Sequence, residues 1–113
     1  MHRTIKFRAW DEDRFMFYPD RLDFKDDRIT VWNGNTFGGV GTAIVQLMQF
    51  TGLLDKNGKE IYEGDIYTTL FPNGEWGSPQ IVTWNNELAG FGLLPNEICE
   101  ILGNIYENPE LLK

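Results

Sequence analysis

The chain has 113 residues, of which 42% are hydrophobic and 14% aromatic, and its seventeen acidic and ten basic residues give a formal net charge of −7. This length and composition indicate one small folded unit and exclude an intrinsically disordered chain. No apolar run approaches the roughly 20 residues that span a bilayer, and no signal-peptide pattern opens the chain, so we expect no association with a membrane.

The first half of the chain predicts short strands separated by turns. Residues 3–10 alternate between apolar and polar side chains, which is the two-residue period of a strand. Residues 14–18 and 28–32 are extended runs rich in aromatic or β-branched side chains. Residues 42–50 follow a flexible glycine-rich loop over 38–42, and their apolar pattern fits a strand or a short helix, of which we favour the strand.

The middle of the chain continues this pattern. Residues 55–58, with the sequence DKNG, predict a tight turn. Residues 61–71 predict an extended segment that bends at Gly64, because a glycine inside a strand is typical of a bulge or bend. Residues 72–79 contain two prolines and two glycines and predict a long loop.

The last part of the chain predicts a hairpin, a strand and a short helical turn. Residues 80–84 and 89–94 flank a polar segment and are typical of the two arms of a hairpin. Residues 98–106 form a last apolar segment. Asn108 and Pro109 favour a helix start as N-cap and first residue. We therefore predict a mainly β fold with at most one short C-terminal helical turn.

The sequence offers few groups for catalysis or for metal binding. Cys99 is the only cysteine and His2 the only histidine, which argues against a structural zinc site, since such a site needs several of these ligands. Ser78 is the only serine, so a Ser-His-Asp relay is not expected. A single cysteine cannot form an internal disulfide, which favours the reducing cytoplasm. We expect a protein that is not an enzyme and that uses no cofactor or metal.

Glu63 and Asp65 are the acidic pair with the most interesting position. They flank Gly64, where the chain is expected to bend. Two carboxylates can support metal-dependent hydrolysis. However, an Asp at such a bend often accepts hydrogen bonds from the backbone of the turn, and we favour this structural role.

Lys6, Arg8 and Trp10 fall on one face of the first predicted strand. Two cations and an indole can hold a phosphate and stack on a base, so these residues are candidates for binding a small anionic ligand. Trp32 and Asn33, at the end of another predicted strand, are candidates for the same site. The alternatives are a solvated face with Trp10 under a loop, and a core position for Trp32.

Glu75 and Trp76 lie in the predicted 72–79 loop. A tryptophan in such a loop either anchors the loop or contacts a partner, and both readings stay open. Residues 57–113 carry two basic and nine acidic residues, which argues against a nucleic-acid partner. An acidic surface of this kind favours a basic protein as the partner.

Three blocks of sequence carry a family resemblance. They lie at the start, the middle and the end of the chain: residues 5–11 (IKFRAWD), residues 48–53 with 55–66 (MQFTGL and DKNGKEIYEGDI), and residues 103–112 (GNIYENPELL). Together and in this order they resemble the YopX family of phage and prophage proteins. Residues 36–44 depart from the family pattern, which often has acidic residues there.

The resemblance implies a mostly β fold with a small SH3-like barrel in the C-terminal half. We therefore expect an N-terminal β subdomain over 1–52, containing a β-hairpin region, packed on an SH3-like barrel subdomain over 53–113. The resemblance also implies a phage origin, a homo-oligomer, and a place in the cytoplasm of the infected or lysogenic bacterial host. It supplies no catalytic residues.

Three functions are compatible with these observations. The first is a non-enzymatic phage accessory protein that binds a small anionic, nucleotide-like ligand and so sequesters a host immune signal, with Lys6, Arg8, Trp10, Trp32 and Asn33 as its site. The second is a protein–protein adaptor that acts on a host or phage protein through Glu75 and Trp76. The third is a module that binds single-stranded nucleic acid, which the net charge disfavours.

Overall fold

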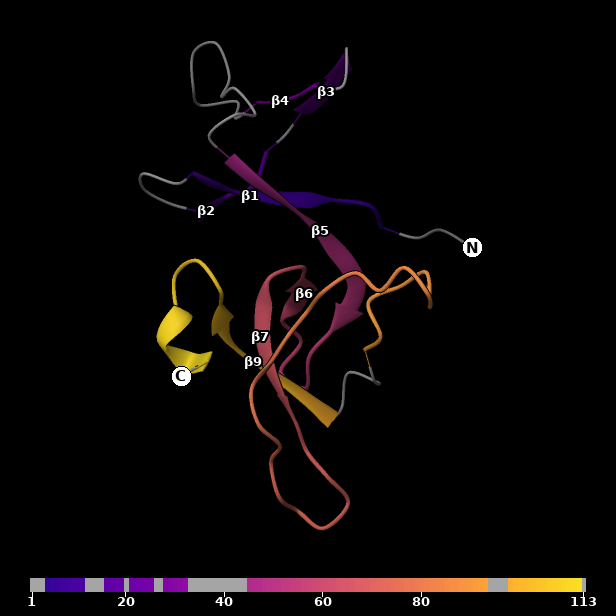
Figure 1. The fold of residues 1–113 in the computed structure, drawn as a ribbon, viewed down its shortest axis with the longest axis vertical. Helices are drawn as coiled ribbons and strands as arrows, with labels where there is room; N and C mark the ends of the chain where they lie inside the picture. Colours follow the sequence, from indigo (N-terminus) through magenta and orange to yellow (C-terminus); the bar gives the residue numbers. More distant parts are fainter. Residues whose placement is uncertain are drawn as a thin grey trace. The chain divides into compact units, whose positions relative to one another are not determined.

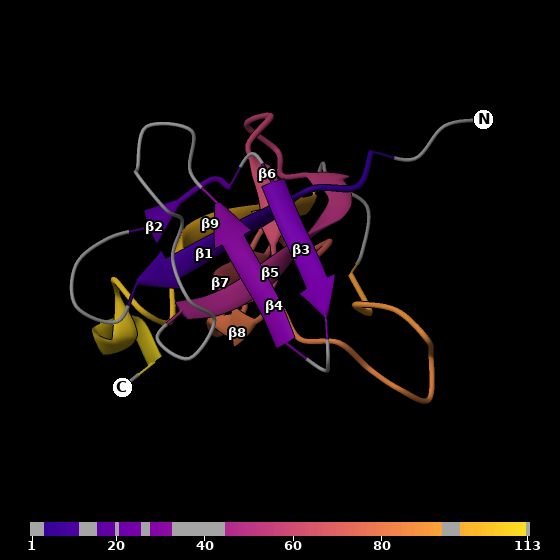
Figure 2. The same ribbon diagram turned by 90° about the horizontal axis from the view of Figure 1, so that it is seen from above.

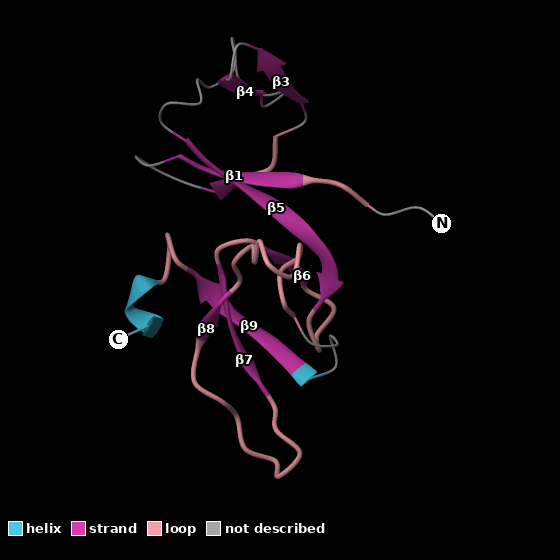
Figure 3. Ribbon diagram, turned by 45° about the vertical axis from the view of Figure 1, so that its right-hand side comes forward, coloured by secondary structure: helices cyan, strands magenta, loops and turns pink. Residues whose placement is uncertain are grey.

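The computed structural model describes residues 4–11, 16–19, 21–25, 28–32, 45–93 and 98–112. Within these residues the fold is mainly β, as predicted: Figure 3 shows strands joined by loops, with a 3-10 turn at Pro109–Leu112 near the C-terminus. The chain forms two compact units. One is Lys6–Gln49, and the other is Phe50–Lys113 together with Met1–Ile5.

Three antiparallel strands form a sheet in the Lys6–Gln49 unit. β1 (Phe7–Asp11) lies between β2 (Met16–Phe17) and the first part of β5 (Val45–Leu54). The strand over 42–50 that we favoured over a helix is confirmed by β5. Compared with the predicted segment over 3–10, β1 begins later, at Phe7, and ends one residue further on, at Asp11.

A separate hairpin lies across this sheet (Figure 2). It consists of β3 (Arg21–Lys25) and β4 (Arg28–Trp32). The core of the unit is small and apolar, and its members come from both layers: Ala9, Phe17 and Val31 are buried, with Leu22 and Leu47 packed against them. β4 confirms the predicted strand over 28–32, whereas β3 was not predicted.

Four strands and the end of β5 build the Phe50–Lys113 unit. β7 (Asp65–Thr69) lies between β8 (Gln80–Ile81) and β9 (Cys99–Asn104), and both neighbours are antiparallel to it. β6 (Glu60–Tyr62) pairs with the end of β5. These curled sheets are compatible with a small barrel. Their core contains Ile61, Val82 and Cys99, with Tyr67, Phe91, Leu93 and Ile101 packed against it.

The turn between β5 and β6 is tied to β9 by the carboxylate of Asp55. Its Oδ1 accepts hydrogen bonds from the backbone N–H groups of Asn57 and Lys59, both at 2.9 Å, and its Oδ2 accepts one from Ile101 at 3.0 Å. Burial alone would raise the pKa of Asp55, but these three donors outweigh it and hold the pKa below its ordinary value. The predicted 55–58 turn is therefore confirmed, and it also joins two distant segments.

The predicted hairpin over 80–94 is smaller than expected. Asn85 and Gly90 exchange backbone hydrogen bonds of 2.7 and 3.2 Å, but this is an isolated bridge and no ladder extends from it among the described residues up to 93. The strand at the start of this region, β8, pairs instead with β7. The arms are held by side chains: the rings of Trp84 and Phe91 meet edge to face with centroids 5.3 Å apart.

Near the C-terminus, Asn104 organises the predicted helical turn. Its Oδ1 accepts the backbone N–H groups of Tyr106 and Glu107 at 3.0 and 2.9 Å. Asn108 precedes the 3-10 turn, as predicted, but its side chain accepts a hydrogen bond from the backbone of Asn104 at 3.2 Å. The predicted loop over 38–42 lies outside the described residues.

Candidate functional site

The loop after β7, residues 70–77, presents aromatic side chains to solvent, and we call it the aromatic loop. Figure 1 shows it extending past the end of β7, and Figure 3 shows the long connection between β7 and β8 to which it belongs. The backbone of the loop is a narrow hydrogen-bonded ladder: Phe71 donates to the carbonyl of Glu75 at 2.8 Å, and Gly77 donates to that of Thr69 at 2.8 Å. The hydroxyl of Thr68 donates to the carbonyl of Gly77 at 2.6 Å. The loop is therefore a fixed extension of the sheet.

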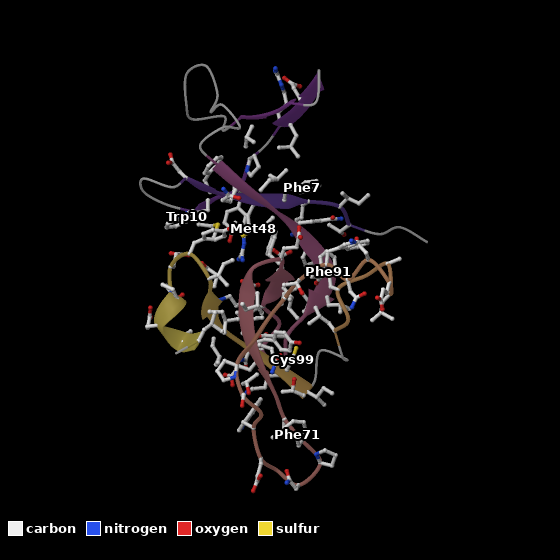
Figure 4. All side chains as sticks on the ribbon, viewed as in Figure 1. Phe7, Trp10, Met48, Phe71, Phe91 and Cys99 are labelled. Carbon is white, nitrogen blue, oxygen red and sulfur yellow. The ribbon has the colours of Figure 1, made fainter. Side chains whose placement is uncertain are left out.

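Phe71 and Trp76 are the two large exposed side chains of this loop, with 49% and 43% of their surface accessible. Figure 4 shows Phe71 on the loop, away from the labelled core residue Cys99. A β-carbon added at Gly77 would lie 2.9 Å from a ring atom of Phe71, so this ring lies close over the glycine backbone. Glu75 lies between the two aromatic residues and is exposed.

A lysine of the same unit faces the ring of Trp76. The Nζ atom of Lys56 lies 5.7 Å from the ring centroid, within the range of a cation–π interaction. The same Nζ atom is 4.0 Å from Oε1 of Glu100 on β9. An aromatic ring, an ammonium group and a carboxylate from three separate segments therefore meet on the surface of the unit.

The predicted ligand residues Lys6, Arg8 and Trp10 lie on or directly before β1 and are partly or fully buried. Arg8 is buried, with 5% of its surface accessible, and it pairs across the sheet with Met48, which is buried too. Lys6 and Trp10 are half-buried. Both faces at the middle of β1 are thus covered, because Ala9 on the opposite face is fully buried in the core.

The side chains of the other two predicted ligand residues, Trp32 and Asn33, lie outside the described part of the structure. The backbone of Trp32 ends β4, where it pairs with Arg21, and its side chain lies outside the described part of the chain. Asn33 is likewise outside the described residues. The structure thus places Arg8 and Trp10 on β1 and Lys6 directly before it, and whether Trp32 and Asn33 join them stays a prediction.

Asp65 has the structural arrangement that the sequence favoured for the pair Glu63 and Asp65. Oδ2 of Asp65 accepts a hydrogen bond from the backbone N–H of Tyr62 at 2.8 Å, which closes the turn at Gly64. Gly64 has a φ of 83°, a left-handed conformation that glycine adopts without strain. Asp65 is buried, and no three His, Cys, Asp or Glu side chains within the described residues come close enough to hold a metal ion.

Sequence reasoning missed two residues that lie near Trp76 of the aromatic loop, Lys56 and Glu100. Lys56 was read only as part of a turn, and Glu100 as part of an apolar strand. Their approach to Trp76 depends on pairing between distant segments, which no local pattern reveals. Phe71 was assigned to the end of an extended segment, although the Pro-Asn-Gly that follows it is a local signal of a turn.

No helix within the described residues is long and apolar enough to cross a membrane.

The comparisons with known proteins agree with this fold. A family model described as YopX protein matches residues 6–113. The crystal structure of protein EF1440 from Enterococcus faecalis has 25% sequence identity, a TM-score of 0.62, and coverage of 99% of this chain and 100% of that one. Protein yopX from Bacillus subtilis has 21% identity, a TM-score of 0.65, and coverage of 96% and 98%.

No curated protein matches the chain. The family model nevertheless spans nearly all of the chain, and it includes the second and third sequence blocks that carried the resemblance and residues 6–11 of the first. The prediction of the family from those blocks is thereby confirmed, and the chain belongs to the YopX protein family.

Proposed function

We propose that this protein is a non-enzymatic adaptor that binds another protein through its aromatic loop. The observation that carries the proposal is the exposure of Phe71 and Trp76 on a hydrogen-bonded loop. Aromatic residues are enriched at protein interfaces and among the residues that dominate binding energy. Because the loop backbone is already fixed, binding would cost little loop ordering.

The size of the expected effect is consistent with this role. A buried aromatic side chain removes about 150–250 Å² from water. Hot-spot residues of this kind cost about 2 kcal/mol or more of binding free energy when they are truncated. Two such side chains, Phe71 and Trp76, are enough to act as the centre of a small interface, with Glu75 at its polar rim.

Photo-crosslinking tests the adaptor proposal. The full chain carries a photoreactive phenylalanine analogue at Glu75, or as a control at Leu88, which is exposed on a different loop. After irradiation in lysate of a bacterial host, we expect a discrete crosslinked product from position 75. Excess unlabelled wild-type chain should suppress this product, and Trp76→Ala should abolish it. Equal crosslinking from both positions, or a product indifferent to Trp76→Ala, would contradict the proposal.

Binding of a small anionic ligand on β1 is the second candidate function. It is favoured by one observation, the burial of Arg8, because a planar guanidinium shielded from water binds phosphate or carboxylate through two parallel hydrogen bonds. Trp10 lies on the same strand, and Lys6 directly precedes it. Titration calorimetry with cyclic dinucleotides and ADP-ribose derivatives tests it, and saturable heat that Arg8→Met removes would support it. Absence of heat from the folded protein across the panel would exclude it.

A further inference from the structure

Trp76 already holds a cationic group that belongs to the chain itself. The ammonium of Lys56 lies over the ring at 5.7 Å from its centroid and 4.0 Å from the carboxylate of Glu100. Both distances are near the outer limit for such interactions. The side chains of Lys56 and Glu100 each have 34% of their surface accessible. The ammonium group of Lys56 is therefore held weakly, although the Trp76 ring and the Glu100 carboxylate both favour a cation at this position.

The groups that surround the ammonium are fixed by backbone hydrogen bonds. The N–H of Leu70, which forms a bridge with Trp76, donates to the carbonyl of Ile98 at 2.8 Å. The N–H of Lys56 donates to the carbonyl of Cys99 at 2.9 Å, beside Glu100. The ring and the carboxylate are thus held on one framework, and the element free to exchange is the flexible side chain of Lys56.

An arginine suits this place better than the resident lysine. Its planar guanidinium stacks on an aromatic face and forms two parallel hydrogen bonds with a carboxylate, whereas an ammonium acts as a point charge. Charge supports a basic occupant too, since residues 57–113 carry nine acidic and two basic residues. Lys56, which lies just before this acidic stretch, supplies the ammonium group that faces Trp76 and Glu100.

We infer that Trp76 and Glu100 form a recognition site for an arginine side chain of a basic protein segment, with Lys56 as an internal competitor for it. The inference rests on the proposed adaptor function and names the chemistry of its partner. In the free protein, Lys56 covers the ring and neutralises the carboxylate. In the complex, the incoming guanidinium takes its place and the ammonium moves into solvent.

The test uses the full chain and two peptides of equal length, N-acetylated tetra-arginine amide and its uncharged, N-acetylated citrulline analogue. Binding is followed by the indole N–H signal of Trp76, assigned with Trp76→Phe. We expect tetra-arginine to shift this signal and the citrulline peptide to leave it unchanged. Glu100→Gln should weaken the binding about two- to five-fold, the size of an exposed cation interaction.

The decisive comparison is between Lys56→Met and Lys59→Met. Both substitutions remove one positive charge from the same turn, so general electrostatic attraction rises equally, but only Lys56 faces Trp76. We expect Lys56→Met to bind tetra-arginine about two- to five-fold more tightly than Lys59→Met. Lys56→Gln provides a second variant should the methionine disturb folding.

Equal affinities of the two variants, an unmoved Trp76 signal, or equal shifts with the citrulline peptide would each overturn the inference. Crosslinking at position 75 that still depends on Trp76 would then show that the adaptor function holds without arginine recognition. Loss of both results would remove the two proposals together.

Discussion

Asp55 is the residue that joins the most distant parts of the Phe50–Lys113 unit. Its carboxylate is buried, with 2% of the residue accessible, and it accepts backbone hydrogen bonds within its own turn and from Ile101 on β9. Hydrogen bonds to a charged acceptor are stronger than those between neutral groups. Asp55 therefore fixes the turn that carries Lys56 relative to the strand that carries Glu100.

We expect Asp55→Asn to lower the free energy of unfolding by about 2 kcal/mol at neutral pH, because one acceptor charge and part of the hydrogen bonding are lost. Urea denaturation measures this loss. The wild-type contribution of Asp55 is present above the ordinary pKa of 3.8 and disappears as the pH falls through the lower pKa of the folded state. The difference between the two proteins should therefore narrow below pH 3.8.

Asp23→Asn serves as the control for this substitution. Asp23 forms an exposed ion pair with Arg21 at 2.7 Å, and such surface pairs contribute about 0–1 kcal/mol. A loss for Asp55→Asn no larger than that for Asp23→Asn, or a difference that stays constant down to pH 3, would show that the Asp55 carboxylate does not hold the turn.

At the scale of elements, the end of β9 and the 3-10 turn are fitted to each other by Gly103. A β-carbon at this position would lie 2.7 Å from Cγ of Asn108, closer than real β-carbons come to other atoms. The side chain of Asn108 fills this space and accepts a hydrogen bond from the backbone of Asn104. Close packing against Asn108 therefore explains why a glycine stands at position 103.

Gly103→Ala should displace Asn108 and cost about 1–3 kcal/mol of unfolding free energy, as is usual when a packed site is overfilled. Thermal and urea unfolding measure the loss. Gly90→Ala is the matched control, since a β-carbon there meets only an ordinary contact at 3.8 Å. If Gly103→Ala were as stable as Gly90→Ala, the close packing of the C-terminal turn would be refuted.

The elements with regular patterns could be predicted from the sequence, whereas those that depend on distant partners could not. The extended segment predicted over 61–71 and its bend at Gly64 correspond to β6, the turn and β7, because the signals for them are local. β3 was missed since its five residues lie between two strong turn signals. The 80–94 hairpin was overestimated because the backbone of β8 pairs with β7.

In the candidate site, too, residues with a local sequence signal could be predicted, whereas contacts between distant segments could not. Glu75 and Trp76 were recognisable as loop residues that could contact a partner. The cation over Trp76 was not, because Lys56 reaches it only through the framework that β9 provides. Arg8 was predicted as a ligand residue, with a solvated strand face as the alternative; the structure buries Arg8, and its role as a ligand residue stays a prediction.

At the scale of the whole molecule, the YopX fold divides into two units, and the exposed aromatic loop belongs to one of them. The acidic excess lies in the same part of the chain, within 57–113. An adaptor that binds a basic protein needs this combination of apolar anchors and negative charge, because the charge speeds encounter and the anchors supply affinity.

The most direct measurement of this binding is quantitative co-purification from a bacterial host with three forms of the full chain. These are the wild type, Phe71→Ser with Trp76→Ser, and, as a matched control, Leu88→Ser with Leu112→Ser, which alters two exposed apolar residues elsewhere. We predict that the wild type and the control retain the same basic protein and that the aromatic-loop variant loses it at least about tenfold, as expected for two hot-spot residues. Equal recovery by all three forms, or no specific partner of the folded wild type, would contradict binding through the aromatic loop.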